Sequence, residues 1–508
     1  MHVSAFLEHH GMSSNPFRDE EARHDDVLTS LASKQFEHAE AGKIVGDFNR
    51  PTSAVVFGEK GSGKTAIRLQ IARAINTHNQ QHPDNRVLPV AYDDLNTVLD
   101  RFSRRVNLKH PEKALEKLTL NDHMDGILQQ AVPQLVDAAL GERSASANGH
   151  DDEGSIAIDP AALKRMPRAR KLDWLLLQAL YDRPQQAVER GPRLARALRV
   201  FSPARLPWLK RFTLMLWLLS AAGYLWYMFF ERIEPEWMML SGLVLLIGIT
   251  VGVTGMLVYE WFRMGALARK VAGQLRVLDR MASSIQTSLS RLPKAALNRS
   301  LVPVDDLEET RYGLLATLRQ MIEPLGYRNI AVLIDRVDEP SLVRGDAAHM
   351  RSVIWPMFDN KFLQLPGYAI KMMLPLELRY ALYGQSKDFF QHARLDKQNL
   401  IDRLEWSGVT LFDLCNQRMA ACTPEGTHAA TLPALFDTSI TREDIIAALD
   451  QMRQPRDAFK LLYAAIQQHC HQTSDDDPDW TIARASLLSA LDRQKERLDA
   501  LRSGLGPA

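Results

Sequence analysis

The sequence predicts an α/β fold with a parallel sheet, interrupted by a two-helix transmembrane hairpin and completed by a C-terminal helical lid subdomain. Three observations predict it. The apolar run "SAVVF" (53–57) leads into a glycine-rich turn and then a helical pattern. A second apolar run, "NIAVLID" (329–335), ends in a carboxylate far along the chain. Between these runs lie two long uncharged stretches, 212–230 and 237–262.

Composition limits the class of protein. A chain of 508 residues can form two to four domains, each with its own core. The net charge is +1, so no overall field indicates nucleic-acid binding. Cys415, Cys422 and Cys470 are an odd number without paired spacing, which favours a reducing compartment over a disulfide framework. The N-terminus lacks a basic start before a long apolar stretch, so we expect no signal peptide.

The glycine-rich turn carries a phosphate-binding pattern. Residues 58–65 read "GEKGSGKT" and match G-x-x-x-x-G-K-[ST], between a predicted strand and a predicted helix at 66–76. Backbone N–H groups of such a loop curl around phosphate oxygens. We expect Lys64 to bridge the β- and γ-phosphates of ATP and Thr65 to bind Mg²⁺ through its hydroxyl. The predicted nucleotide-binding residues are Gly58, Gly61, Ser62, Gly63, Lys64, Thr65 and Ala66.

The distant carboxylate completes a P-loop NTPase core of the additional-strand type. We expect Asp335 to hold hydrated Mg²⁺ together with Thr65. Arg336 follows it, where many additional-strand cores have a catalytic glutamate. The next acids are Asp338 and Glu339, and either can orient or deprotonate the attacking water; we favour Asp338. The alternative is that both acids cap the next helix.

Later segments fit the same core. Residues 86–99 suit a second core strand that leads into a helix, and 368–375 suits a strand between the two motif strands. In 394–408, basic side chains can reach a phosphate or belong to a solvated helix face; they are Arg394, Lys397 and Arg403. Arg456 begins a helix at 453–466, where it can face the nucleotide from a lid or serve only in capping or a surface ion pair.

The uncharged stretches predict a membrane hairpin. At a rise of about 1.5 Å per residue, each crosses a hydrocarbon core of about 30 Å. The loop at 231–236 is mostly acidic, whereas both flanks are basic, so the loop should lie outside and both termini in the cytoplasm. The flanks can also rest on anionic lipid, or form a nucleic-acid patch, which their position disfavours. The basic residues are Arg183, Arg190, Arg193, Arg196, Arg199, Arg205, Lys210, Arg211, Arg263, Arg269, Lys270, Arg276 and Arg280.

The predicted organisation has seven parts. A polar, small-residue stretch at 142–155 reads as a linker, and helical patterns on both sides of the hairpin read as a juxtamembrane stalk. The parts are an N-terminal helical segment (1–50), the first half of the core (51–141), linker and juxtamembrane helices (142–200), the hairpin (201–265), return helices (266–325), the second half of the core (326–400) and the helical lid (401–508).

These motifs, in this order, resemble the KAP family of P-loop NTPases, whose members are similar to the STAND and AAA+ branches. The resemblance rests on "GEKGSGKT", the hairpin, "IAVLID", "LDK" (395–397) and "PRDAFK" (455–460), within residues 40–470. It implies a membrane-anchored ATPase that works as a switch or assembly platform, as a homo-oligomer with an unidentified protein partner. It further implies a bacterial inner membrane and anti-phage defence. The chain departs from the family at Arg336, because the family has adjacent acids there; D-x-x-D-E is similar to the NACHT pattern.

Three functions therefore remain open. The first is a slow Mg²⁺-dependent ATPase that switches assembly with a partner. The second is a nucleotide-binding scaffold with little hydrolysis, which Arg336 favours. The third is an oligomer whose hairpin permeabilises the bilayer. Gly248 and Gly252 form a G-x-x-x-G face that can join helices or protomers, or be ordinary membrane-helix glycines.

Overall fold

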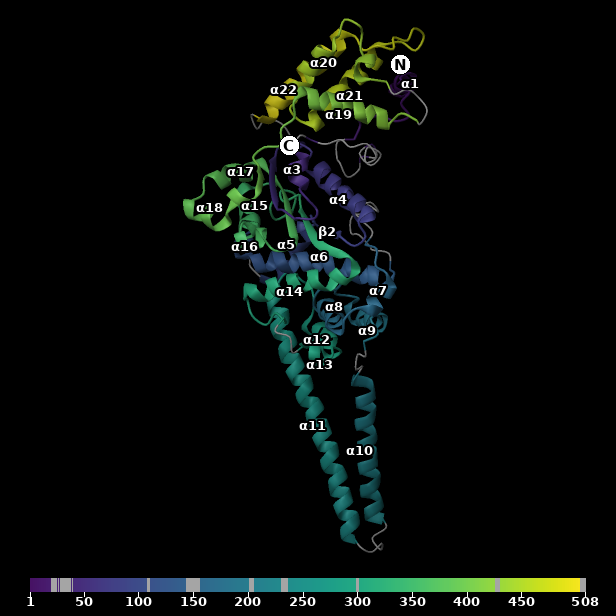
Figure 1. The fold of residues 1–508 in the computed structure, drawn as a ribbon, viewed down its shortest axis with the longest axis vertical. Helices are drawn as coiled ribbons and strands as arrows, with labels where there is room; N and C mark the ends of the chain where they lie inside the picture. Colours follow the sequence, from purple (N-terminus) through teal and green to yellow (C-terminus); the bar gives the residue numbers. More distant parts are fainter. Residues whose placement is uncertain are drawn as a thin grey trace. The chain divides into compact units, whose positions relative to one another are not determined.

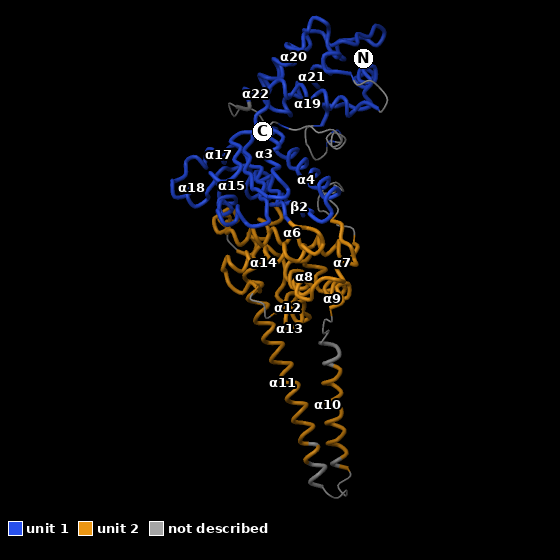
Figure 2. The backbone as a smooth tube through the Cα atoms, viewed as in Figure 1, with its two compact units in different colours: residues 1–95, 151–154, 329–508 blue, residues 96–150, 155–328 orange. Residues whose placement is uncertain are grey.

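The computed structural model describes residues 1–19, 25, 27, 38, 40–106, 110–142, 156–200, 205–229, 236–297, 301–424 and 430–502. The chain divides into two compact units (Figure 2). Unit 1 comprises residues 1–95, 151–154 and 329–508, and unit 2 comprises residues 96–150 and 155–328. Apart from Glu142 and Glu236, the predicted linker at 142–155 and the predicted loop at 231–236 lie outside the described residues.

A five-stranded sheet forms the centre of unit 1, with the order β2-β3-β4-β1-β5. β4 pairs in parallel with both β1 and β3, which confirms the prediction that 368–375 lies between the two motif strands. All five residues of β1 and all eight of β4 are buried, as expected for parallel strands covered on both faces. The strands are β1 (Ala54–Gly58), β2 (Arg86–Tyr92), β3 (Tyr327–Ile334), β4 (Tyr368–Pro375) and β5 (Asn399–Ile401).

Residues 394–408 differ from the predicted helix face. Residues 399–401 form β5, which pairs in parallel with β1 at the edge of the sheet. Arg394 precedes them with a positive φ of 46°, which ends the short helix before it. The sequence pattern missed this strand because three residues are too few to show a period, and the edge of β1 supplies their hydrogen-bond partners.

Helices cover the sheet of unit 1 (Figure 1). The apolar positions of α4, including Ile67, Ile71 and Ile75, recur every three to four residues and pack in one core cluster with Val56 of β1 and Met373 of β4. The helices of this part are α3 (Ala41–Val45), α4 (Lys64–Gln81), α15 (Ala347–Ile354), α16 (Asn360–Leu363), α17 (Leu376–Tyr383) and α18 (Lys387–Ala393).

A helical subdomain with its own core completes unit 1. Ser407 and Thr441 each form a capping box that starts a helix, so short-range signals define these boundaries. Phe6 and Phe17 of the N-terminal segment belong to the same core cluster. The helices are α1 (Val3–His9), α19 (Gly408–Ala421), α20 (Arg442–Asp450), α21 (Pro455–Gln472) and α22 (Arg484–Arg502).

Unit 2 is mainly helical in its described residues, and its last two residues, Tyr327 and Arg328, begin β3. Its helices are α5 (Leu95–Val106, whose first residue is in unit 1), α6 (Leu120–Leu140), α7 (Pro160–Arg165), α8 (Arg168–Tyr181), α9 (Ala187–Ala197), α10 (Arg205–Phe229), α11 (Glu236–Gln274), α12 (Ala282–Ser290), α13 (Lys294–Leu297) and α14 (Glu308–Ile322). Every residue of α8 from Leu172 to Tyr181 is buried. This segment, predicted as part of a stalk, is therefore the centre of a packed helical bundle.

Several basic residues that were expected to face lipid are bound inside this bundle. Arg190 is buried and pairs with Asp137 and, at 2.8 Å, with Asp182. Arg280 is also buried, and its guanidinium donates hydrogen bonds to the Ala179 carbonyl and to Ser288. The lipid interpretation is therefore wrong for Arg190 and Arg280, because a buried, paired guanidinium cannot reach head groups.

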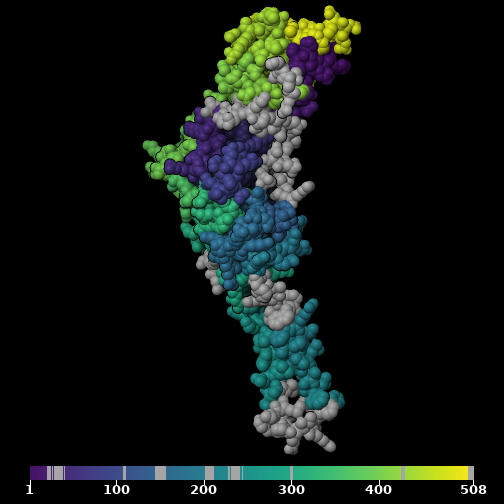
Figure 3. Space-filling model, turned by 45° about the vertical axis from the view of Figure 1, so that its right-hand side comes forward, coloured from purple at the N-terminus to yellow at the C-terminus, as the bar shows by residue number. Residues whose placement is uncertain are grey.

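Helices α10 and α11 run side by side (Figure 1). Trp217 donates to Thr254 at 3.2 Å, and the hydroxyls of Ser220 and Thr250 lie 3.1 Å apart, a register that makes the helices antiparallel. Most of their large apolar side chains are exposed at the surface (Figure 3). Among the described residues, one helical segment, Val244–Gln274, is long and apolar enough to cross a membrane by length and composition.

A lysine is buried inside the sheet of unit 1. Lys371, in the middle of β4, is 2% exposed, and its Nζ has no hydrogen-bond partner among the described residues. Burial alone lowers the pKa of this amine from 10.5 to about 8. The unfolded chain therefore binds more protons than the folded chain between about pH 8 and 10.5.

We expect Lys371→Met to raise the free energy of unfolding at pH 7 by roughly 1–3 kcal/mol, because it removes a buried charge and keeps the volume. In the wild type, Lys371 should make stability rise by about 3 kcal/mol from pH 8 to pH 10.5. The substitution should remove this rise. Denaturant unfolding of the detergent-purified protein at pH 8 and pH 10.5 measures this change in the free energy of unfolding. Lys397→Met, at an exposed lysine, serves as the control; equal pH dependence in both variants would contradict the prediction.

Candidate functional site

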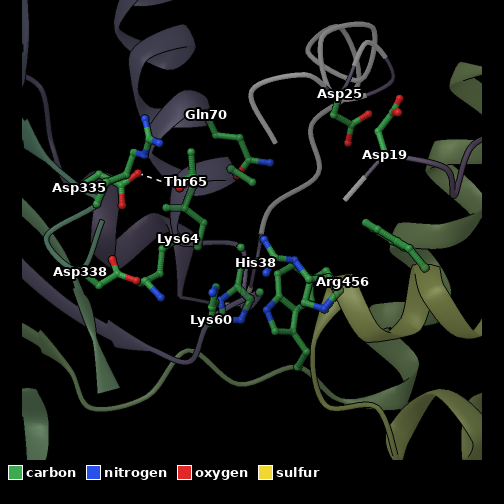
Figure 4. Close-up of a pocket in the computed structure, with 18 of the residues that line it drawn as sticks. Asp19, Asp25, His38, Lys60, Lys64, Thr65, Gln70, Asp335, Asp338 and Arg456 are labelled. Carbon is green, nitrogen blue, oxygen red and sulfur yellow. Dashed lines mark hydrogen bonds between the residues drawn. The ribbon is translucent and has the colours of Figure 1, made fainter. Parts of the chain in front are cut away.

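A cavity of about 590 Å³ in unit 1 brings together the residues that the sequence singled out (Figure 4). Three elements supply them: the glycine-rich loop before α4, the segment after β3, and the beginning of α21. All five predicted catalytic residues line it, namely Lys64, Asp335, Asp338, Glu339 and Arg456. Of the predicted nucleotide-binding residues, Gly61, Gly63, Lys64, Thr65 and Ala66 line it as well.

The glycine-rich loop depends on its glycines. Gly61 and Gly63 have φ values of 93° and 91°, in the left-handed region that favours glycine. A Cβ at Gly61 would lie 2.9 Å from Gln454 Oε1 and 3.1 Å from Arg456 Cβ, so this part of the loop also lies close to the start of α21. Gly58 and Ser62 are not cavity-lining residues. They shape the loop instead, because a Cβ at Gly58 would collide with the Ser62 hydroxyl.

Helix α4 begins directly at this loop. Its N-cap is Gly63, and no side chain caps its first N–H groups. The next residue, Lys64, donates hydrogen bonds from Nζ to the carbonyls of Gly58 and Glu59, both at 2.8 Å. Burial lowers the pKa of Lys64, opposed mainly by the nearby carboxylate of Asp338. A positive helix end and a half-buried ammonium therefore line the same cavity, which suits an anionic ligand.

The two distant motifs meet at one hydrogen bond. Thr65 Oγ1 donates to Asp335 Oδ2 at 2.8 Å, across 270 residues of sequence (Figure 4). Asp335 is 1% exposed and ends β3. Burial raises its pKa, and the Arg68 charge and the Thr65 hydrogen bond oppose that rise. A hydroxyl and a carboxylate at this separation are the oxygen ligands that Mg²⁺ prefers.

Arg68 supports this carboxylate from behind. Its side chain is fully buried on α4, with its guanidinium 3.6 Å from Asp335 Oδ2 and 3.5 Å from Asp93 Oδ2. Asp93 directly follows β2. The sequence analysis missed Arg68, although an arginine on the predicted apolar face of a helix signals a buried ion pair.

The two acids after β3, Asp338 and Glu339, differ in whether an ion pair already holds the carboxylate. Glu339 forms an ion pair with Arg336, whereas Asp338 lies close enough to Lys64 to be the main charge that raises the pKa of its amine. The backbone carbonyl of Asp338 accepts from the Gly345 N–H at 3.0 Å, which holds this turn in place. The alternative that these acids cap the next helix is wrong, because Asp346 caps α15. The geometry favours Asp338 over Glu339 beside the phosphate-binding lysine.

The lid contacts the glycine-rich loop directly. Glu59 forms an ion pair with Arg403 and accepts a hydrogen bond from Gln454, the N-cap residue of α21. Arg456, in the first turn of α21, lines the cavity. Arg403 is therefore bound to a loop carboxylate, whereas Arg394 pairs with Asp396 and does not line the cavity.

Two further parts of the cavity wall escaped the sequence analysis. Trp406 Nε1 donates to the Ser62 carbonyl at 2.8 Å, and the ring of His38 packs edge-on against Trp406. On the opposite side Arg418 holds Asp25 through two hydrogen bonds of 2.6 and 3.1 Å. These residues come from the N-terminal segment and the lid, and no local motif marks them because only the tertiary fold brings them together.

The residues present fit a nucleoside triphosphate with a divalent cation. The loop N–H groups and Lys64 offer donors that suit phosphate oxygens, Thr65 and Asp335 offer oxygen ligands for a cation, and the aromatic and apolar lining suits a base. Comparison of the chain with protein-family models, with curated proteins and with solved structures finds no significant match.

We expect Arg68→Met to lower the free energy of unfolding by about 3–5 kcal/mol, because it leaves two buried carboxylates without their cation. Adding Asp93→Asn should restore part of this loss by removing one of the charges. Gln80→Met, at an exposed position of the same helix, is the control and should change stability by less than about 0.5 kcal/mol. Thermal unfolding measures all three. A single variant as stable as the wild type would show that Arg68 is not needed to offset these charges.

Proposed function

We propose that the protein is a Mg²⁺-dependent P-loop ATPase, similar to the KAP family, that works as a membrane-anchored switch. One observation carries the proposal: the Thr65–Asp335 hydrogen bond lies in the cavity that Lys64 lines. A hydroxyl after the phosphate-binding lysine and a carboxylate at a strand end form the metal-binding pair of such enzymes. The additional strand β4 between β1 and β3 supports the same fold.

The roles follow from the positions of the side chains. The loop N–H groups and Lys64 hold the phosphates, and Thr65 with Asp335 holds the cation. Mg²⁺ supplies neutralisation of the charge on the β- and γ-phosphate oxygens. Asp338 orients and deprotonates the attacking water, because its carboxylate lies near Lys64, the residue that holds the phosphates. Arg456 approaches from the lid and adds positive charge at the phosphates.

The membrane part of the proposal has two spans. α10 and α11 expose apolar side chains along their lengths and face each other through hydroxyl and indole groups. Their antiparallel register suits a hairpin whose connecting loop is outside and whose two ends, with both termini, are cytoplasmic. The remaining basic flanks favour this orientation, since lysine and arginine counts govern topology whether or not acids pair with them. A bacterial inner membrane and a homo-oligomer complete the proposal.

The end of α11 is clamped within unit 2, which supports the switch. Just beyond it, Arg276 pairs with Asp122 at 2.6 Å and donates to Thr119 Oγ1 at 2.9 Å. Arg105, on α5, donates to the Ala272 carbonyl at 3.3 Å. α5 therefore holds the last turn of the helix that is long enough to cross a membrane.

This clamp has a short covalent route to the nucleotide site. α5 follows β2 in the chain, and Asp93 between them is paired with Arg68, which also faces Asp335. A change at Asp335 when a nucleotide binds can shift Arg68 and Asp93, and thus the start of α5. This is a contiguous physical path, and coupling along it is the proposed output of the ATPase.

A scaffold with little hydrolysis is the second candidate. The Arg336–Glu339 ion pair favours it, because it occupies one of the two acids that can act on water. Turnover distinguishes the two candidates. An oligomer that permeabilises membranes, and a role in anti-phage defence, stay expectations from the family resemblance.

We expect Lys64→Ala to weaken Mg²⁺-ATP binding and to lower turnover by roughly 10²–10³-fold, because it removes the buried charge at the phosphates. Asp338→Asn should lower turnover by about 10²-fold and leave nucleotide affinity nearly unchanged. Lys397→Ala, outside the cavity, is the control. Calorimetry and phosphate release on detergent-purified protein measure both quantities. Equal turnover in wild type and Lys64→Ala would exclude hydrolysis at this site, and binding without turnover in the wild type would support the scaffold.

The proposed topology is tested by cysteine labelling. Cys415, Cys422 and Cys470 are all buried, so they give little background. We expect a membrane-impermeant maleimide to label Ile233→Cys on intact cells, because the connecting loop is outside. Ser474→Cys, at an exposed position of unit 1, should react only after permeabilisation. Labelling of Ile233→Cys only in permeabilised cells would overturn the two-span arrangement.

A further inference from the structure

Arg336 has an unusual backbone for its residue type. Its φ is 62°, in the left-handed region, two residues after the end of the buried strand β3. L-residues with side chains rarely adopt this conformation, and glycine does so without steric cost. Such backbone strain persists where the surrounding structure holds it, and strained residues cluster at ligand clamps and switch regions. An arginine thus occupies a backbone position that would suit glycine better, which makes its guanidinium a candidate for a role in the site.

The side chain lies at the phosphate end of the cavity. Arg336 is a cavity-lining residue next to Asp335, whose carboxylate accepts the hydrogen bond from Thr65. Lys64 and Asp338 line the same cavity. The guanidinium thus belongs to the group of residues that faces the cation and the terminal phosphate under the proposed function.

Its present partner is easily exchanged. Arg336 pairs with Glu339, three residues later, and the two side chains are 32% and 49% exposed. An ion pair this exposed contributes little, because water solvates both charges and salt screens them. A phosphate group offers more: its oxygens match the planar fork of a guanidinium and carry more charge than one carboxylate.

We propose that Arg336 binds the terminal phosphate of the nucleotide in cis, exchanging Glu339 for the γ-phosphate. This inference rests on the proposed function. The arginine then distinguishes a triphosphate from a diphosphate, because only the triphosphate carries a γ-phosphate. Binding also releases Glu339 from its partner, so the second acid becomes available only when a triphosphate is present. An arginine at this position thereby serves as a sensor of the γ-phosphate.

The test compares affinities for Mg²⁺-ATP and Mg²⁺-ADP. Arg336→Ala should weaken ATP binding by about tenfold to hundredfold and leave ADP binding unchanged, because it removes one charged hydrogen-bonding partner of the γ-phosphate. The ATP affinity of Arg336→Lys should lie between those of the wild type and Arg336→Ala. Lysine keeps the positive charge but lacks the planar guanidinium that can donate two parallel hydrogen bonds. Glu339→Gln should strengthen ATP binding severalfold, because it removes the competing carboxylate.

Two further variants separate a sensor from a structural role. Arg336→Gly relaxes the backbone, so its thermal unfolding temperature should equal or exceed that of the wild type while its ATP preference falls as in Arg336→Ala. Arg394→Ala is the matched control: Arg394 also has a positive φ and pairs with a nearby acid, Asp396, but does not line the cavity. It should leave both affinities unchanged.

The outcomes are distinguishable. If the wild type binds neither nucleotide, the proposed function fails. If it binds both and Arg336→Ala keeps the wild-type ratio of ATP to ADP affinity, the ATPase proposal stands and the sensor is overturned. Equal losses of ATP and ADP affinity in Arg336→Ala, with a lower unfolding temperature, would assign Arg336 a structural role and also overturn it.

Discussion

The hydrogen bond between Thr65 and Asp335 is the contact on which the rest of the site depends. It joins the start of α4 to the end of β3 and therefore fixes the glycine-rich loop against the second motif strand. The carboxylate can be buried there only because Arg68 lies behind it with a compensating charge. Asp93 shares the same guanidinium, so the end of β2 is tied to this centre as well. One buried cation thus organises three strand and helix ends around the proposed nucleotide site.

The same arrangement gives a proposed ATPase a means of acting on a membrane helix. Within unit 2, the residues just after α11 are held by α6 and α5, the latter continuing directly from β2. Asp122 is buried in the first of these contacts, whereas its partner Arg276 is 26% exposed. The apolar helices are inserted in the chain between β2 and β3, so the bundle that holds them precedes Asp335 by one strand.

Patterns of short range were enough to predict much of this fold. The buried strands, the strand at 368–375 and its place in the sheet, and the helix after the glycine-rich loop follow from apolar runs and periodicity. Most of the predicted site residues also line one cavity, because a loop and a carboxylate that follow neighbouring parallel strands meet at the same edge of the sheet. By contrast, β5 was missed, since three residues carry no period and depend on β1 for their hydrogen bonds.

The sequence by itself determined the glycine-rich loop, the acidic residue at a strand end and the apolar helices between them, because glycine positions, strand ends and uncharged stretches act locally. Only the tertiary structure decided which partners those residues have. It paired Arg336 with Glu339, placed Trp406 on the loop carbonyl of Ser62, and buried Lys371 within the sheet. These outcomes depend on contacts between segments that are distant in the chain or on a backbone conformation that residue type disfavours. Neither leaves a periodic signal in the sequence.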